Sequence, residues 1–164
     1  MTRSALSGLI GAGLFTVIGL LNGAHGVSLP RLALFGAALG VIALIDLREH
    51  RIPNRIVLPA IAICAVLAGP AALRHSLPAL ALVALLLVLA FVQPAALGMG
   101  DVKQALLIAV ALGAAATSAL LLGFALAALV GIAMTIQRGR SALATALPLA
   151  PFLAAGATIA LALT

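Results

Sequence analysis

The sequence predicts an all-α protein, a bundle of about six or seven helices that cross a membrane. Apolar residues make up 65% of the chain and charged residues only 7%, and the mean hydropathy is +1.36. Such a composition cannot supply the polar surface of a water-soluble domain. The 164 residues provide about six or seven segments of the roughly 20 residues that span a bilayer as a helix. We therefore predict a single transmembrane domain over residues 1–164.

The charge and the cysteine content argue against several other classes of protein. The net charge of +6 is spread over short loops and aromatic residues are scarce, so it indicates membrane topology and not nucleic-acid binding. Cys64 is the only cysteine, which excludes an internal disulfide and a CxxC zinc module. No cluster of ligand residues suggests a metal, and we expect no cofactor.

The first two apolar stretches predict the first two crossings. Residues 5–21 follow Arg3, and their basic start and apolar centre also fit a signal peptide, an alternative that stays open. The second crossing covers residues 32–45, and Pro30 is suited to its first turn because the missing N–H costs nothing there. Gly36 and Gly40 have the GxxxG spacing of a helix-packing face.

The most charged decapeptide, residues 46–55, separates the second crossing from the third. Pro53 favours an extended conformation at Ile52, so the second helix is predicted to stop before Ile52. Asn54 is predicted to cap the third helix.

The rest of the chain predicts further crossings, separated by glycine, proline or charged residues. These stretches are residues 55–67, 77–92, 102–136 and 142–163. We expect a mild kink at Pro59 and a division of 102–136 into two crossings near 113–118. Pro148 and Pro151 interrupt the last stretch. Gly69, Pro70, Arg74 and His75 predict a loop after the third crossing, and residues 137–140 form a basic loop before the last.

The basic residues predict which loops face the cytoplasm. With seven crossings, alternate loops lie on the same side of the membrane. One side then receives Arg3, Arg48, Arg51, Arg55, Lys103, Arg138 and Arg140, and the other receives only Arg31 and Arg74. By the positive-inside rule the first side is cytoplasmic.

Acidic residues are rare and lie at two places. Residues 97–103, Leu-Gly-Met-Gly-Asp-Val-Lys, contain Asp101, and the only other acids are Asp46 and Glu49. A carboxylate beside a membrane core is costly unless it is paired, solvated or protonated, so such acids are candidates for a functional site. The predicted topology places Asp46 and Asp101 at helix ends on the same face of the membrane. They can therefore be neighbours.

Two neighbouring carboxylates can hydrolyse a peptide bond. In a partly dry site they cannot both ionise cheaply, so they share a proton, which is the chemistry of an aspartic protease. Gly98 and Gly100 lack side chains, so backbone there can end a helix and lie close to an extended peptide. Lys103 either holds a phospholipid head group or tunes Asp101, and the sequence does not decide between these roles.

The residues around both acids resemble the prepilin peptidases, the type IV leader peptidase family of GxGD membrane aspartic proteases. The first motif is Asp46-Leu47-Arg48 with Ile52-Pro53-Asn54 and Pro59, and the second is Gly98-Met99-Gly100-Asp101-Val102-Lys103. The segment Pro148-Leu149-Ala150-Pro151-Phe152-Leu153 also resembles the proline-rich final helix of that family. The resemblance runs from about residue 29 to the end of the chain, with the core motifs within 29–140.

This resemblance implies that Asp46 and Asp101 are the catalytic pair of a multi-pass protein in the bacterial inner membrane. They would cleave the basic leader of type IV prepilins or pseudopilins at the cytoplasmic face. Many members of the family also methylate the new amino terminus through a cytosolic insertion with paired cysteines. This chain has a single cysteine and no long loop, so it resembles the compact, peptidase-only members of tight-adherence pilus systems. We expect no methyltransferase domain.

Recognition of the substrate needs an explanation, because both the leader and the cytoplasmic loops are basic. We hypothesise that Arg48, Arg51 or Arg55 meets the acidic residue that prepilins carry just inside their apolar segment. Packing of apolar helices in the bilayer would supply most of the affinity.

Other readings of the sequence stay open at this stage. Asp46 and Asp101 could carry protons in a small proton- or ion-coupled transporter, although both lie at predicted helix ends and not at the middle of crossings. Asp101 could simply favour the start of a helix. The GxxxG faces could also build a non-catalytic assembly subunit or a homo-oligomer.

Overall fold

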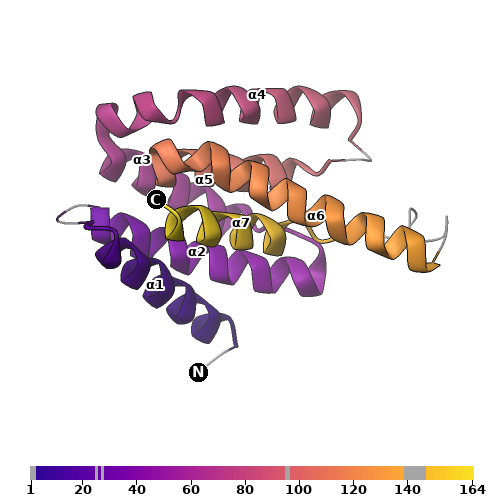
Figure 1. Ribbon diagram of the computed structural model, residues 1–164, viewed down its shortest axis with the longest axis horizontal. Helices are drawn as coiled ribbons and strands as arrows, with labels where there is room; N and C mark the ends of the chain where they lie inside the picture. The colour runs from indigo at the N-terminus through magenta and orange to yellow at the C-terminus, as the bar shows by residue number, and fades with distance from the viewer. Residues whose placement is uncertain (1–2, 25, 27, 95–96, 139–146) are drawn as a thin grey trace.

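The computed structural model describes residues 3–24, 26, 28–94, 97–138 and 147–164. Over these residues the chain forms seven α-helices and one short 3-10 helix, η1 (Figure 1). The helices are α1 Arg3–Leu21, α2 Ser28–Glu49, α3 Asn54–His75, α4 Leu77–Val92, α5 Met99–Leu112, η1 Gly113–Ala115, α6 Ala116–Arg138 and α7 Ala150–Ala162. The predicted all-α fold is confirmed.

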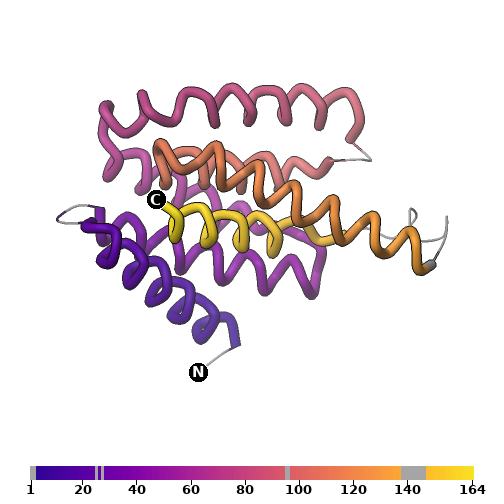
Figure 2. Tube along the Cα trace, in the orientation of Figure 1, coloured from indigo at the N-terminus to yellow at the C-terminus, as the bar shows by residue number. Residues whose placement is uncertain are grey.

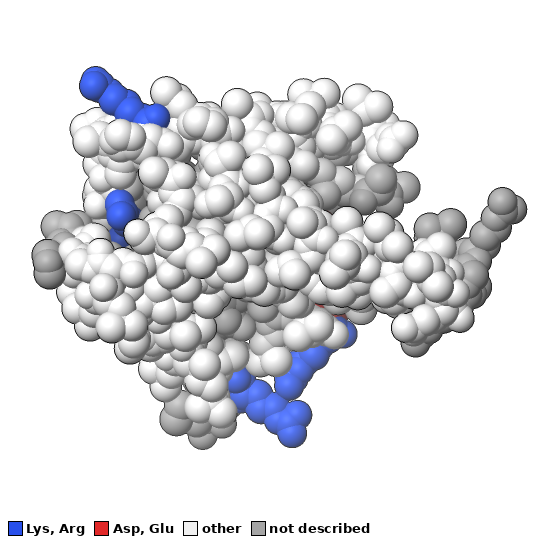
Figure 3. Space-filling model, in the orientation of Figure 1, with Lys and Arg blue, Asp and Glu red and all other residues white. Residues whose placement is uncertain are grey.

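The surface of the bundle is suited to lipid. Four stretches of the described residues are long and apolar enough to cross a membrane: α1, α2, α3 and the stretch Met99–Gln137, which runs from α5 into α6. Helices α4 and α7 are shorter and also apolar. Large apolar side chains such as Val66, Phe91 and Ile136 are exposed. In Figure 3 the visible face is almost entirely uncharged, and basic side chains lie at its edges. The chain is therefore a polytopic helical membrane protein.

Helix α5 lies at the centre of the bundle. It contacts α2, α3, α4, α6 and α7, and every residue from 107 to 112 is buried. The trace in Figure 2 shows α6 crossing in front of α5, while α7 lies in front of α2. The C-terminal half of α5 is thus held by neighbours on several sides, and it anchors the helix whose first turn carries Asp101.

Glycines allow two helix pairs to approach closely. A Cβ atom on Gly36 would overlap the carbonyl oxygen of Gly11, and one on Gly40 would overlap that of Ser7, so α1 and α2 touch backbone to backbone. The predicted packing role of Gly36 and Gly40 is confirmed. Between α6 and α7, Gly156 lies in the same way against the backbone of Gly123.

The third helix breaks close to its predicted end, but no loop follows the break. We expected the helix to end at residue 67 and a loop to follow, whereas a second helical segment continues to His75. Gly69 adopts φ 69° and ψ 172°, which kinks the helix, whereas Pro59 lies inside it without non-helical dihedral angles. Pro70 directly follows the kink, and a proline is tolerated in the first turn of the segment that begins there.

Two other boundaries can be compared with the sequence. The predicted division near 113–118 is confirmed by η1, where Gly113 has φ 58° and ψ −119°. Helix α7 begins at Ala150, with Pro151 in its first turn. The predicted start of the last segment at residue 142 lies outside the described residues, as does Arg140.

The contact between α1 and α2 gives a first testable prediction. We expect Gly36→Ala to lower the free energy of unfolding by about 1–3 kcal/mol, because the added methyl group overpacks the contact with Gly11. Gly13→Ala is the matched control, since a Cβ at Gly13 meets nothing within 4 Å and should be neutral or slightly stabilising. Denaturant titration in detergent measures the free energy of unfolding of both variants. Equal effects of the two substitutions would contradict the packing role.

Candidate active site

A cavity at one end of the bundle contains both candidate acids. Its volume is about 210 Å³, and it lies between the end of α2, the segment that follows α2, and the start of α5. The lining residues are Asp46, His50, Arg51, Ile52, Asn54, Gly98, Gly100 and Asp101. The carboxylates of Asp46 and Asp101 are close enough to interact electrostatically. The structure therefore makes neighbours of two acids that are 55 positions apart in the sequence.

The glycines before Asp101 have a structural explanation. Gly98 is the N-cap of α5 with φ −74° and ψ 143°, and Asp101 is the third residue of the helix. The Asp101 carboxylate accepts a hydrogen bond from the backbone of Gly98, as the third helical residue does in a capping box. A Cβ on Gly98 would lie 3.2 Å from Oδ2 of Asp101, and one on Gly100 would lie 3.0 Å from Cβ of Ile52. Both glycines therefore leave room for tight contacts in the cavity.

Asp46 is held by the first residue of α7. Its side chain is 5% exposed, and Oδ2 accepts a hydrogen bond of 3.1 Å from the backbone N–H of Ala150. The carbonyl oxygen of Ala150 in turn accepts a hydrogen bond of 3.0 Å from Nε2 of Gln104, which is fully buried in α5. One residue, Ala150, thus joins α2, α5 and α7 beside the cavity through its N–H and its carbonyl group.

Gln104 and Ala150 contribute to the site although neither was predicted from the sequence. Gln104 is an uncharged polar residue next to Lys103 at the start of a long apolar stretch. Because buried polar side chains in a membrane need hydrogen-bond partners, that position was a usable signal. Ala150 acts through its backbone, so its side chain gave no signal.

Lys103 joins two helices at the edge of the cavity. Its Nζ donates a hydrogen bond of 2.8 Å to Oδ1 of Asn54, the first residue of α3. The prediction that Asn54 caps α3 is wrong, because Pro53 is the N-cap residue and no side chain caps this helix. The extended conformation of Pro53 (φ −73°, ψ 122°) leaves the Asn54 side chain to pair with α5.

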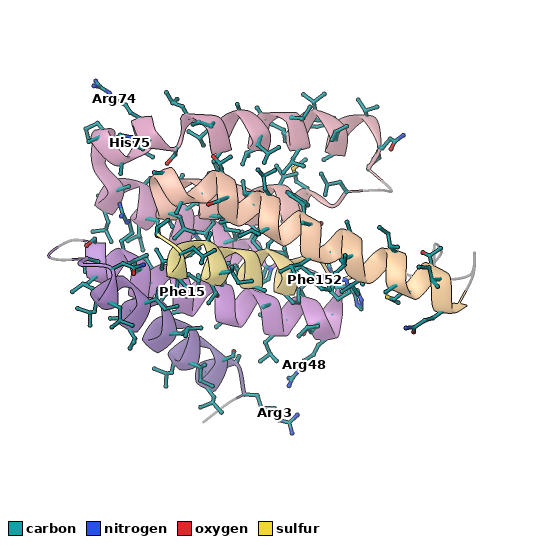
Figure 4. All side chains as sticks on the ribbon, viewed as in Figure 1. Arg3, Phe15, Arg48, Arg74, His75 and Phe152 are labelled. Atoms are coloured by element: carbon teal, nitrogen blue, oxygen red, sulfur yellow. The ribbon has the colours of Figure 1, made fainter. Side chains whose placement is uncertain are left out.

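The arginines of residues 46–55 occupy different positions. Arg51 lines the cavity that contains both acids. Arg55 and Pro53 line an adjoining cavity of about 380 Å³, which Arg51 also borders. Arg48 lines neither cavity, and its side chain projects away from α2 (Figure 4). Arg51 is therefore the arginine best placed to meet a group bound near the acids.

His50 is another lining residue that the sequence analysis did not single out. It follows the last residue of α2 with φ 50°, and its N–H donates to the carbonyl oxygen of Asp46 at 2.9 Å. A left-handed residue commonly ends a helix in this way, although glycine is usual there. The turn directs the chain back across the cavity, which places Arg51 and Ile52 in its lining. No group of three metal-ligating side chains is found among the described residues.

The fold and this cavity define a class: a helical membrane protein with a pair of carboxylates at one end of its bundle. A family model described as the type IV leader peptidase family matches residues 33–136, which include both acids. The chain belongs to this family, so it is a membrane protease of the type IV leader peptidase kind. Comparisons with curated proteins and with solved structures gave no significant match.

The Gln104 hydrogen bond gives a prediction that does not depend on activity. Gln104→Leu removes the donor to Ala150, so the first turn of α7 should open more often. We expect faster amide hydrogen exchange in residues 147–153, whereas Gln137→Leu, at an exposed position of α6, should leave exchange there unchanged. Unchanged exchange in both variants would show that Gln104 does not hold α7.

Proposed function

We propose that the protein is an aspartic endopeptidase that cleaves the leader of type IV prepilins or pseudopilins, with Asp46 and Asp101 as its catalytic pair. The observation that carries this proposal is that two of the three acids of the chain line one cavity at one end of an apolar bundle. Membership of the type IV leader peptidase family supplies the reaction class.

The reaction needs one ionised and one protonated carboxylate. The ionised carboxylate takes a proton from a water molecule as the water oxygen attacks the scissile carbonyl carbon. The protonated carboxyl group gives its proton to the carbonyl oxygen. In the second step the first carboxyl group gives the proton that came from water to the leaving nitrogen, and the C–N bond breaks. The second carboxylate takes a proton back from a hydroxyl group of the intermediate, which leaves a carboxylic acid and restores the starting pair.

Backbone contacts of Asp46 and Asp101 support these roles of the two carboxyl groups. The N–H of Ala150 is bonded to one oxygen of Asp46, Oδ2, which orients that carboxylate and leaves Oδ1 for water. Gly98 holds Asp101 at the start of α5. Gly98 is also exposed, so an extended peptide can approach the cavity along backbone that carries no side chain.

The charge distribution supports a cytoplasmic position for this cavity. Arg48, Arg51, Arg55 and Lys103 lie at the end of the bundle that contains the acids, whereas Arg31 and Arg74 lie near the other ends of the same helices. By the positive-inside rule the first end faces the cytoplasm of a bacterial inner membrane. The leader of a prepilin is cytoplasmic in the same topology, so it can reach the cavity.

We also propose that the enzyme is a peptidase only. Methylation in this family resides in a cytosolic insertion with paired cysteines, whereas Cys64 is the only cysteine here and is buried in α3. The segment 50–53 between α2 and α3 is too short to hold such an insertion.

The catalytic pair is tested by amide substitutions that keep size and remove ionisation. We expect Asp46→Asn and Asp101→Asn each to lower kcat/KM for prepilin cleavage by about 10³-fold, the usual contribution of a general acid or base. Glu49→Gln is the matched control, because Glu49 is exposed at the end of α2. This variant should cleave the prepilin normally. Co-expression with a prepilin and quantification of the mature product measures all three. Normal cleavage by either Asp variant, in correctly folded protein, would refute the dyad.

The positions of the arginines predict an order of effects. Arg51→Glu should lower kcat/KM by about tenfold or more, because it replaces a charge-assisted contact with repulsion of an acidic substrate residue. Arg55→Glu should have a smaller effect, and Arg48→Glu should leave cleavage unchanged because its side chain points away. The prediction fails if Arg48→Glu has the largest effect, and unchanged processing in all three variants would eliminate the arginine hypothesis.

A further inference from the structure

A third cavity lies at the end of the bundle opposite the acids. Its volume is about 310 Å³. It is bordered by Leu112 at the C-terminal end of α5, whereas the acid-containing cavity is bordered by Gly100 at the N-terminal end of that helix. Its lining includes Asn22, Arg31, Leu32, Leu112, Leu161 and Thr164.

Arg31 carries the charged side chain of this cavity, and no acidic side chain of the described residues lies in the lining with it. The side chain is partly buried, and its Nε is fully buried without a hydrogen-bond partner. The three acidic side chains of the chain, Asp46, Glu49 and Asp101, lie at the other ends of α2 and α5. None of them can pair with Arg31. A partly buried cation with no acidic side chain beside it favours a bound anion, so an external anion would be stabilised here.

The rest of the lining is suited to an amphipathic anion. The amide of Asn22 donates to the carbonyl oxygen of Leu161, which fixes the end of α1 against α7. Thr164 adds a hydroxyl group, and Leu32 and Leu112 provide an apolar wall. Because several helices end or begin here, the cavity lies at the level where a bilayer changes from hydrocarbon to polar head groups.

We propose that this cavity binds a phosphate-bearing anion, with the guanidinium of Arg31 as its counter-ion. Arginine matches phosphate oxygens with a fork of donors. A phospholipid head group and free inorganic phosphate share this chemistry. A phospholipid contacts more of the cavity lining than inorganic phosphate does, because its acyl chains can lie along the apolar wall.

The experiment compares the unaltered protein, Arg31→Gln and Arg74→Gln in detergent. Arg74 is the matched control, because it lies near the same end of the bundle and projects from the surface (Figure 4). Native mass spectrometry with added phosphatidylglycerol measures lipid retention. Binding of the free anion is measured by the shift in melting temperature with inorganic phosphate, compared with chloride at equal ionic strength. We expect Arg31→Gln to weaken binding of phosphatidylglycerol by about tenfold, the size of one charge-assisted hydrogen bond, and Arg74→Gln to leave it unchanged.

Each outcome bears on the proposal. Selective loss of phosphatidylglycerol binding in Arg31→Gln supports a head-group site, and selective loss of the response to inorganic phosphate supports a free-anion site. Equal binding by all three proteins, or equal losses in both variants, overturns the proposal. If Arg31→Gln does not fold, the unaltered chain still decides: native mass spectrometry should show one phosphatidylglycerol retained per protein when the lipid is in excess. A broad series of lipid adducts with no preferred single adduct would contradict a specific site.

Discussion

The hydrogen bond from the backbone N–H of Ala150 to Asp46 is the contact on which the rest of the site depends. A carboxylate buried in an apolar bundle is costly unless donors surround it. Ala150 supplies one donor, and Gln104 holds Ala150 from the other side. Because the three residues belong to α2, α7 and α5, these two bonds fix the relative positions of the helices that surround the acid-containing cavity.

The same bonds require close packing of the bundle. Lipid is as apolar as the helix surfaces, so helices in a membrane associate through close contact of small residues and through polar bonds. Gly156 of α7 lies against Gly123 of α6, and Gly100 of α5 lies against Ile52. These contacts bring α7 and residues 50–53 near enough to α5 for the polar groups to meet. The packing and the polar bonds of the site therefore stabilise each other.

The sequence predicted those parts of the molecule that depend on composition and local pattern. The apolar stretches predicted the helices, Gly113 the break between α5 and α6, and the alternation of loops the common position of Asp46 and Asp101. The loop predicted after residue 67 was wrong, because the chain becomes helical again directly after the break at Gly69. The Ala150 contact was out of reach, since it is made by a backbone group and depends on how α7 packs. Sequence patterns carry little information about such packing between distant segments.

The central claim is that positions 46 and 101 share a cavity in the membrane-embedded protein. Cross-linking tests it most directly, with Asp46→Cys and Asp101→Cys in a Cys64→Ala chain treated with a short bifunctional thiol reagent in native membranes. The structure predicts efficient intramolecular linkage of these cysteines. A control chain with Asp46→Cys and Arg74→Cys, whose cysteines lie at opposite ends of the bundle, should not be linked. Linkage of the 46–101 pair no greater than that of the control would contradict the account.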